Sequence, residues 1–410
     1  MNSRQLGRLA ALGSAVTLGT LVASFASCAT NADADPAEED ASSTLPDSSP
    51  AEIESGLAEA GCDASDPSCI QELVPCETVA WCLVPMGVGA SDTLTAVWGT
   101  SRNDVWAVGS GGTIVHHDGT GWTATPSGVF NTLLAVWGSG PNDVWAVSST
   151  RVILHSTGFT DGKATWTNVP ARDEEYLIRT VWGSSPDDVR IAGWDPWNFP
   201  RANQFVKTTL ADGGVPWRAL SGKYSEVTYE VTSIWGSSGA DVWMTADNSV
   251  DLDFGVPHER GLIFHGTPSD GGVDAGGAAD SLTWARVDSE SSHRLEALWG
   301  SSGSDVWAVG VHGTIRHLSA GDERWQPIDS PTTETLRGVW GSGPNDVWLV
   351  GDGATILHYD GTKIEPTSTQ LPTGQKPNLR AVWGSSADDV WIVGDGAALH
   401  YTGRKPGIGG

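Results

Sequence analysis

The feature that most constrains this chain is a repeat that returns seven times after residue 90. Each copy contains Val-Trp-Gly-Ser, a short turn and Asp-Val-Trp, or close variants of these. The first tryptophans of the copies are Trp98, Trp137, Trp182, Trp235, Trp299, Trp340 and Trp383. A repeat of this length predicts a series of equal structural units, each of which buries its apolar face against its neighbours.

Each copy reads as four short β-strands. In the first copy, runs of apolar and β-branched residues occur at AVWG, DVWAVG and TIVHH, and a fourth run begins at Trp122. Gly, Ser, Asn and Asp separate these runs, which is the pattern of strands joined by tight turns. Four strands per copy at this spacing are typical of propeller blades. The sequence therefore predicts an all-β, seven-bladed β-propeller over residues 78–404.

The seventh copy lacks a fourth strand, because the chain has little room left after Tyr401. A matching run stands at the other end of the repeats, where Trp81-Cys82-Leu83-Val84-Pro85 is similar to the runs that start at Trp122 and Trp166. We expect this N-terminal run to close the ring as the outer strand of the seventh blade. That arrangement would leave no exposed sheet edge at the seal.

These repeats resemble those of bacterial seven-bladed propellers built from VWG-turn-DVWAVG units, which are common in secreted proteins and lipoproteins of myxobacteria. They are more distantly similar to the propeller repeats of two-component regulators. The resemblance covers roughly residues 78 to 404 and implies the fold. It does not imply a particular activity, since one fold hosts many functions.

The residues before the repeats predict an exported protein. Residues 1–27 combine two early arginines with a short apolar run and read as a signal peptide. Phe25-Ala26-Ser27-Cys28 resembles a lipobox, in which Cys28 receives lipid after cleavage; ordinary cleavage nearby and free secretion is the alternative. Residues 28–77 form an acidic linker rich in Ala, Ser and Pro, and residues 405–410 a disordered tail.

Four further cysteines, namely Cys62, Cys69, Cys76 and Cys82, cluster at the end of the linker. In an exported chain they predict two disulfides, with three possible connectivities. Their spacing does not match the close pairs of a structural zinc site. Because Cys82 lies on the proposed closing strand, we expect its disulfide to pin the linker to the propeller.

The formal net charge of −27 argues against nucleic acid and anionic membrane surfaces as partners. We expect contact with a membrane only through the lipid anchor. The expected location is the outer membrane or cell surface as a lipoprotein, or otherwise the periplasm or the exterior. A monomer is expected.

Residues that recur in every copy are interpreted as structural. Of the 21 tryptophans, all but two fall at three fixed repeat positions and are expected in the core. An aspartate ends the first hairpin turn of each copy, and we expect it to accept backbone N–H bonds across that turn. A histidine recurs on the third strand of six copies, and a hydrogen bond within each blade is expected rather than a metal ligand.

Binding residues are expected where the repeat is broken. The loop between the second and third strands is SGG in the first copy but much longer in the third and fourth copies. Variation on a rigid scaffold marks the surface that binds. The candidate ligand-binding residues are Arg190, Trp194, Trp197, Phe199, Arg201, Asp251, Asp253 and His258. Aromatic and arginine side chains suit a sugar or a partner protein; alternatively, these aromatics cover the altered third blade.

The functional expectation is a binding or scaffold module for an extracellular protein or polysaccharide. No catalytic motif occurs in the sequence, and no cofactor is expected, although the acidic residues of the fourth-copy loop keep Ca²⁺ in consideration. The first alternative is a carbohydrate-active hydrolase or lyase with acids at the mouth of the channel. The second alternative is a structural component of the envelope without a small ligand.

Overall fold

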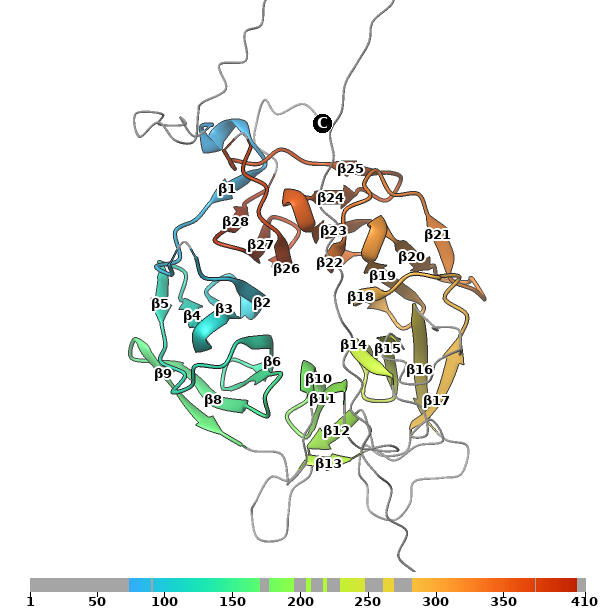
Figure 1. Cartoon of the computed structure of the whole chain (residues 1–410), viewed down its shortest axis with the longest axis horizontal. Helices are drawn as coiled ribbons and strands as arrows, with labels where there is room; N and C mark the ends of the chain where they lie inside the picture. Colours follow the sequence, from blue (N-terminus) through green and yellow to red (C-terminus); the bar gives the residue numbers. More distant parts are fainter. Residues whose placement is uncertain are drawn as a thin grey trace, which may run out of the picture. The chain divides into compact units, whose positions relative to one another are not determined.

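The structure is a computed structural model, and it describes residues 74–89, 91–169, 177–194, 204–207, 217–219, 229–247, 261–268, 282–372 and 374–403. These residues form seven four-stranded antiparallel sheets arranged as the blades of a propeller (Figure 1). The prediction of an all-β, seven-bladed fold is confirmed.

Blades 1 to 4 follow the order of the chain. Blade 1 consists of β2 (Leu94–Ser101), β3 (Asp104–Gly109), β4 (Ile114–His117) and β5 (Trp122–Ala124), and blade 2 of β6 (Leu133–Gly140), β7 (Asp143–Ser148), β8 (Ile153–Thr160) and β9 (Lys163–Asn168). Blade 3 consists of β10 (Leu177–Ser185), β11 (Asp188–Trp194), β12 (Gln204–Lys207) and β13 (Trp217–Ala219). Blade 4 consists of β14 (Glu230–Ser238), β15 (Asp241–Asp247), β16 (Leu262–Pro268) and β17 (Leu282–Val287).

Blades 5 to 7 complete the ring. Blade 5 consists of β18 (Leu295–Ser302), β19 (Asp305–Gly310), β20 (Ile315–Leu318) and β21 (Gln326–Ile328). Blade 6 consists of β22 (Leu336–Gly343), β23 (Asp346–Gly351), β24 (Ile356–Tyr359) and β25 (Ile364–Pro366). Blade 7 consists of β26 (Leu379–Ser386), β27 (Asp389–Gly394), β28 (Ala398–Tyr401) and β1 (Trp81–Leu83). Short 3-10 turns lie at Cys76–Thr78 (η1), Ser110–Gly112 (η2), Val311–Gly313 (η3) and Asp352–Ala354 (η4).

The Val-Trp-Gly motif joins each blade to the next. A Cβ placed on Gly138 would lie 2.5 Å from the indole of Trp98 in the preceding blade, and one placed on Gly99 would lie 2.8 Å from the indole of Trp383. The same contact recurs at every blade boundary, with Trp137 on Gly183, Trp182 on Gly236, Trp235 on Gly300, Trp299 on Gly341 and Trp340 on Gly384. The motif requires glycine because two groups occupy the space of a side chain, namely the neighbouring indole and the backbone carbonyl of the turn aspartate in the same blade. The seven indole contacts form a closed cycle.

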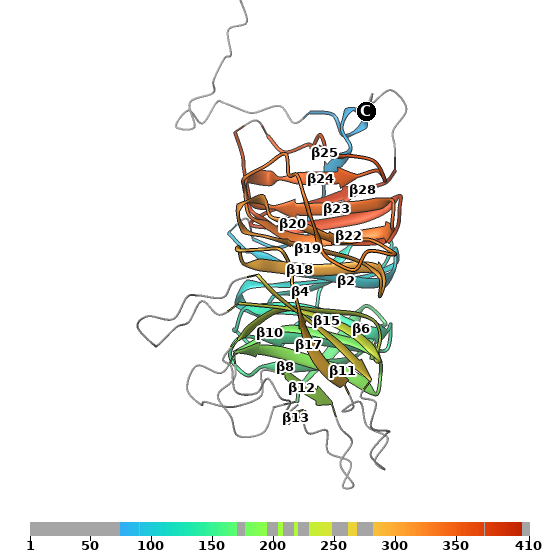
Figure 2. The same cartoon turned by 90° about the vertical axis from the view of Figure 1, so that its right-hand side faces the viewer.

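The second strand of each blade is buried on both faces. In β3, five consecutive residues from Val105 to Gly109 are buried, and β19 is buried along its full length. The blades follow one another around the ring, so that each sheet has a neighbouring blade on either side (Figures 1 and 2). Each apolar cluster accordingly combines residues of adjacent blades, as where Val97 and Val105 pack with Trp391. These strands read as apolar runs for the same reason as other strands that are covered on both faces.

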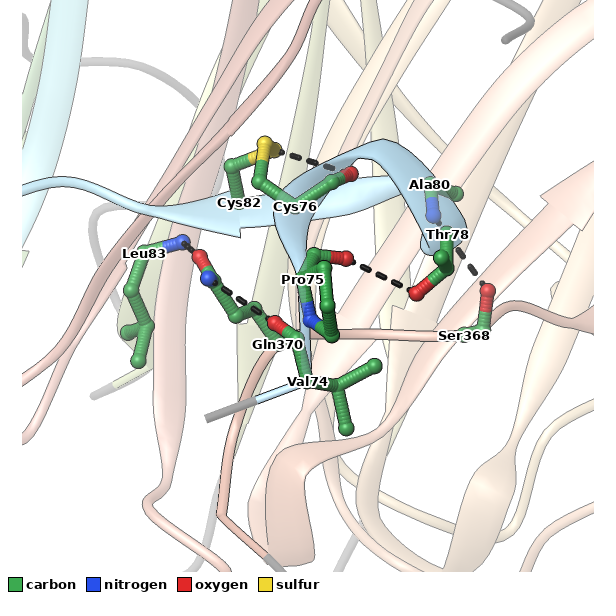
Figure 3. The surroundings of a disulfide bond; sticks show 9 residues. All are labelled: Val74, Pro75, Cys76, Thr78, Ala80, Cys82, Leu83, Ser368 and Gln370. Carbon is green, nitrogen blue, oxygen red and sulfur yellow. Dashed lines mark hydrogen bonds between the residues drawn. A yellow bond between two sulfur atoms is a disulfide. The ribbon is translucent and has the colours of Figure 1, made fainter. Parts of the chain in front are cut away.

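The closing strand lies where the sequence predicted it. In β1, Trp81 pairs with Tyr401 and Leu83 pairs with Leu399 of β28. The Trp81 side chain is fully buried, and its ring meets that of Trp348 edge to face at 4.9 Å. Figure 3 shows Gln370 bridging this segment, since its side chain accepts from Leu83 N at 2.9 Å and donates to Val74 O at 3.0 Å. The N-terminal segment is therefore held to blades 6 and 7 without a covalent link.

One disulfide joins Cys76 to Cys82, with 5.2 Å between their Cα atoms (Figure 3). Both cysteines belong to the same short segment, so this bond fixes the turn that leads into β1. The expectation that the disulfide of Cys82 would tie the linker to the propeller is met only in this local sense. Cys62 and Cys69 lie outside the described residues.

A polar set stands at the hairpin turn between the first two strands of the blades. In blade 1, Asp104 accepts a hydrogen bond from Thr100 Oγ1 at 2.5 Å and one from His116 Nε2 at 2.8 Å. The same aspartate–histidine pair occurs in five other blades, as Asp143–His155, Asp241–His265, Asp305–His317, Asp346–His358 and Asp389–His400. The predicted histidine bond within each blade is confirmed. The expected backbone N–H partners of Asp104 are replaced by side chains, because the third strand brings the histidine to the turn.

The tryptophan of the second strand packs on this polar set. Trp243 and His265 stack with ring centres 3.8 Å apart, and Trp391 and His400 do the same. The Trp106, Trp145, Trp307 and Trp348 side chains are also buried, and among the described tryptophans none is exposed. These indoles are internal, as the sequence analysis expected.

Several sequence predictions fall on residues that the structure does not describe. They are the signal peptide, Cys28, most of the acidic linker and the tail at residues 405–410. Within the described ranges, no helix is long and apolar enough to cross a membrane.

Candidate functional site

The two sides of the ring are defined by the direction of the strands. The turns between first and second strands lie on one side, which we call the hairpin side. The loops between second and third strands, and those leading from one blade to the next, lie on the other, which we call the loop side. The predicted ligand-binding loops of blades 3 and 4 connect second to third strands in the sequence, and residues 195–203 and 248–260 lie outside the described ranges.

Only two of the predicted binding residues are described by the structure. Trp194 ends β11 on the loop side and is half-buried. Arg190 lies in the middle of β11. The other predicted residues, which are Trp197, Phe199, Arg201, Asp251, Asp253 and His258, lie outside the described residues.

Arg190 occupies the interior of blade 3 rather than its surface. Its side chain has no solvent exposure, and its Nε donates to Asp188 Oδ1 at 3.0 Å. In the other blades this position holds the second-strand tryptophan, and the turn aspartate accepts from a histidine that blade 3 lacks. The guanidinium supplies that missing donor to Asp188. Burial thus assigns Arg190 to the fold, and the surface role predicted for it does not fit this position.

A row of paired charges lies on the loop side of blades 3 to 7, near the ends of the inner and second strands. We call it the loop-side rim, and it consists of Arg179, Glu230, Asp247, Arg294, Glu296, Arg337, Asp352, Arg380 and Asp395. In blades 6 and 7 the pairs are two-pronged within one blade. Arg337 contacts Asp352 at 2.5 and 2.7 Å, and Arg380 contacts Asp395 at 3.1 Å twice.

The rim is more densely connected between blades 3, 4 and 5. Arg294 donates to Glu230 at 2.7 Å, to Asp247 at 3.2 Å and to Glu296 at 2.9 Å. Arg179 of blade 3 also contacts Glu230, at 2.7 Å. Two arginines therefore face three carboxylates, and this part of the rim has a net negative charge.

Neighbouring arginines lower the pKa of two rim carboxylates. Burial disfavours the charged carboxylate of Glu230, but the hydrogen bond from Arg294 and the charge of Arg179 outweigh it and lower the pKa of Glu230. Asp395 follows the same pattern, with Arg380 holding its pKa below the ordinary value. A general acid requires a raised pKa. These two carboxylates are therefore suited to electrostatic recognition and to holding the blades together rather than to donating protons.

Trp194 replaces an acidic residue of the rim. Its place at the end of the second strand is taken by Asp247, Asp352 and Asp395 in blades 4, 6 and 7. Without an aspartate in its own blade, Arg179 pairs with Glu230 of the next blade. The change puts an indole at the rim, beside the loop that the sequence analysis singled out.

A residue that the sequence analysis missed is the most exposed large apolar side chain described. Phe130, in the loop from β5 to β6 on the loop side, is 93% exposed. Its neighbours are anchored, because Val129 N donates to Ser127 Oγ at 3.3 Å and Asn131 donates to Thr150 Oγ1 at 2.6 Å. The fold therefore holds this phenylalanine in solvent.

A comparison between blades could have found Phe130. It stands three residues before the first leucine of its inner strand, and the described equivalents in other blades are polar and exposed, namely Ser91, Ser292, Thr333 and Lys376. A solvated repeat position that changes to phenylalanine in one blade indicates a contact that the fold does not require.

Metal sites with three or more protein ligands are not found among the described residues. Within those ranges, no group of three or more His, Cys, Asp or Glu side chains is arranged to hold a metal ion. The acidic loop considered for Ca²⁺ lies outside the ranges.

Comparison with known proteins supports the fold. No protein family and no curated protein matches the sequence of this chain. YCF48 from Cyanidioschyzon merolae is similar in structure, with a TM-score of 0.56 and 16% identity, covering 78% of this chain and 98% of that one. YCF48 bound to D1 peptide gives a TM-score of 0.57 and 17% identity, covering 83% of this chain and 100% of that one.

Two further structures show the same fold. Virginiamycin B lyase from Staphylococcus aureus has a TM-score of 0.57 and 13% identity, covering 78% of this chain and 98% of that one. The extracellular domain of a putative hybrid two-component system from B. thetaiotaomicron has a TM-score of 0.56 and 13% identity, covering 79% of this chain and 41% of that one. At these identities the likeness shows the propeller fold alone.

Proposed function

We propose that the protein is a binding or scaffold module that recognises an extracellular protein or polysaccharide through the loop side of its propeller. The observation that carries the proposal is Phe130, an anchored aromatic side chain that is 93% exposed where other blades have polar residues. The indole of Trp194, at the end of β11, lies on the same side. Aromatic and arginine side chains dominate the binding energy of many interfaces.

The neighbours are compatible with this role. YCF48 has been described bound to a D1 peptide, and another neighbour is an extracellular domain of a two-component system. Propellers therefore serve as binding domains in other proteins. A protein partner is favoured over a glycan at Phe130 because this ring protrudes, so its natural complement is an apolar pocket in a folded protein.

Export and attachment through Cys28, or free secretion, are part of the same proposal. The Cys76–Cys82 disulfide supports it, since disulfides persist in oxidising compartments. The resemblance of the repeats to secreted propellers and lipoproteins agrees with it. The lowered pKa values of Glu230 and Asp395 make these rim carboxylates unsuited to act as the general acid that the carbohydrate-active alternative requires.

The test is a capture experiment with matched variants. The chain is immobilised and exposed separately to the proteins and the polysaccharides of its own cell surface, as wild type, Phe130→Ala and Thr333→Ala. Burying a phenylalanine contributes about 1.5–3 kcal/mol, so Phe130→Ala should weaken binding of the captured partner about 10- to 150-fold. Thr333→Ala should leave binding unchanged. Equal binding by all three proteins would refute the assignment of Phe130.

A glycan array and a hydrolysis assay on the same panel separate the alternatives. Binding without turnover agrees with a module. Turnover that disappears when rim carboxylates are changed would favour the enzyme instead.

A further inference from the structure

Two exposed histidines meet on the loop side of blade 5. His293 lies in the loop from β17 to β18, and His312 lies in η3 between β19 and β20. Their ring centres are 5.1 Å apart, and the ring planes make an angle of 67°. These two rings take no part in the aspartate–histidine pairs of the hairpin side.

His312 occupies a backbone position that favours glycine. Its φ is 56°, while blades 1, 6 and 7 have Gly111, Gly353 and Gly396 there, with φ of 62°, 64° and 63°. A side chain in this left-handed region carries a conformational penalty that glycine avoids. Blade 5 keeps a histidine at this place nonetheless, and it places the ring against a second histidine. Such local strain is concentrated at functional sites.

The separation of the rings fits two ligands of one tetrahedral ion. A histidine nitrogen binds Zn²⁺ at about 2.0–2.1 Å, so each ring centre lies about 3.2 Å from the ion, and two rings at a tetrahedral angle have centres about 5.2 Å apart. The observed 5.1 Å is close to this value. Two imidazoles leave two positions for water or for a side chain of a partner.

The surroundings are compatible with a cation. His293 precedes Arg294, whose charge is met by Glu230, Asp247 and Glu296. The chain as a whole has a formal net charge of −27, which raises the local concentration of cations.

We propose that His293 and His312 form an open binding site for a divalent transition metal ion of the Zn²⁺, Ni²⁺ or Cu²⁺ class. Neutral imidazole is the ligand that such ions favour. The site is independent of the binding role proposed above.

The test uses Zn²⁺ alone and the purified, oxidised full chain. Isothermal titration should show one more Zn²⁺ equivalent for the wild type than for either His293→Ala or His312→Gly. His312→Gly introduces the residue that other blades use, so the loop should keep its shape and the melting temperature should not fall. His117→Ala, which removes a half-buried histidine outside the pair, should bind as the wild type does.

A second readout identifies the ligands. Imidazole ¹⁵N resonances of His293 and His312 should shift on addition of Zn²⁺, whereas those of the aspartate-bound histidines should not. The proposal is overturned if the wild type binds no more Zn²⁺ than the two variants, or if these two resonances do not move.

Discussion

The two sides of the ring differ in how closely their residues follow the repeat. On the hairpin side, the turn aspartate accepts from a Ser or Thr side chain four residues earlier in every blade, and from a histidine in six of them. On the loop side, the equivalent places differ from blade to blade, as with Trp194 against Asp352. Identity along the repeat therefore reflects what each blade needs to fold. A residue that departs from the repeat marks a position where one blade has a role beyond folding.

The largest expected difference in the free energy of unfolding is between variants of two aromatic residues. Trp391 is buried and stacks on His400, whereas Phe130 stands in solvent. Trp391→Ala should lower the free energy of unfolding by about 3–5 kcal/mol, measured by urea denaturation. Phe130→Ala should change it by less than about 0.5 kcal/mol. Comparable losses in the two variants would mean that the loop-side aromatic also belongs to the fold.

Adjacent aspartates on the hairpin side provide the next contrast. Asp389 is 4% exposed and bonds to His400 and Ser385. Asp389→Ala should cost about 1–3 kcal/mol of stability, because it leaves the Nε2 of the half-buried His400 without its acceptor. The side chain of Asp388 is 68% exposed and faces Arg102 at 3.8 Å. For Asp388→Ala the expected loss is below about 1 kcal/mol, and a loss like that of Asp389→Ala would contradict the structural role given to the pair.

Two glycines of β22 test the closed cycle of the Val-Trp-Gly motif. A Cβ on Gly341 would meet the Trp299 indole at 2.6 Å, while one on Gly343 meets nothing within 4 Å. Gly341→Ala should destabilise the protein by about 1–3 kcal/mol through overpacking. Gly343→Ala should be nearly neutral, as thermal unfolding would show. The Asp346 carbonyl lies equally close to a Cβ on Gly341, at 2.6 Å. If both variants were neutral, crowding at the blade boundary would not be what requires glycine.

Acid should weaken the hairpin side. Burial opposes ionisation of Asp389, but hydrogen bonds from His400 and Ser385 hold its pKa below the ordinary value of 3.8, and Asp104, Asp143 and Asp346 behave alike. The unfolded chain then binds more protons in acid. This stability is present above about pH 4 and is lost as the pH falls through the lowered pKa. Asp389→Asn should flatten the dependence between pH 5 and 2 in urea denaturation, and Asp388→Asn should not.

Much of the fold could be predicted because the same strand pattern recurs in seven copies. The blade number, the closing strand at Trp81 and a hydrogen bond of the recurring histidine within its own blade follow from pattern and spacing. The side-chain partners of Asp104 could not be read in this way, because they depend on how the third strand meets the turn. Arg190 was listed among the candidate binding residues because it replaces a tryptophan of the repeat, and only the folded blade shows that its side chain is buried against Asp188.

The candidate site was harder to predict than the fold. The loop-side rim joins residues far apart in the chain, such as Arg179 and Glu230, and only the stacking of blades brings them together. Phe130 and His312 are single changes within short loops. Each becomes visible once the blades are aligned and each position is compared with its counterparts.

The most direct test of whether the partner binds on the loop side attaches a bulky polymer, which acts as a shield, to each side of the ring in turn. Thr333→Cys on the loop side and Asp388→Cys on the hairpin side, both exposed positions, would carry the same polyethylene glycol chain, and the affinity for the captured surface partner would be measured for both. The shield at residue 333 should abolish binding while the one at residue 388 leaves it intact. Loss of binding only with the shield at residue 388 would place recognition on the hairpin side and contradict this account.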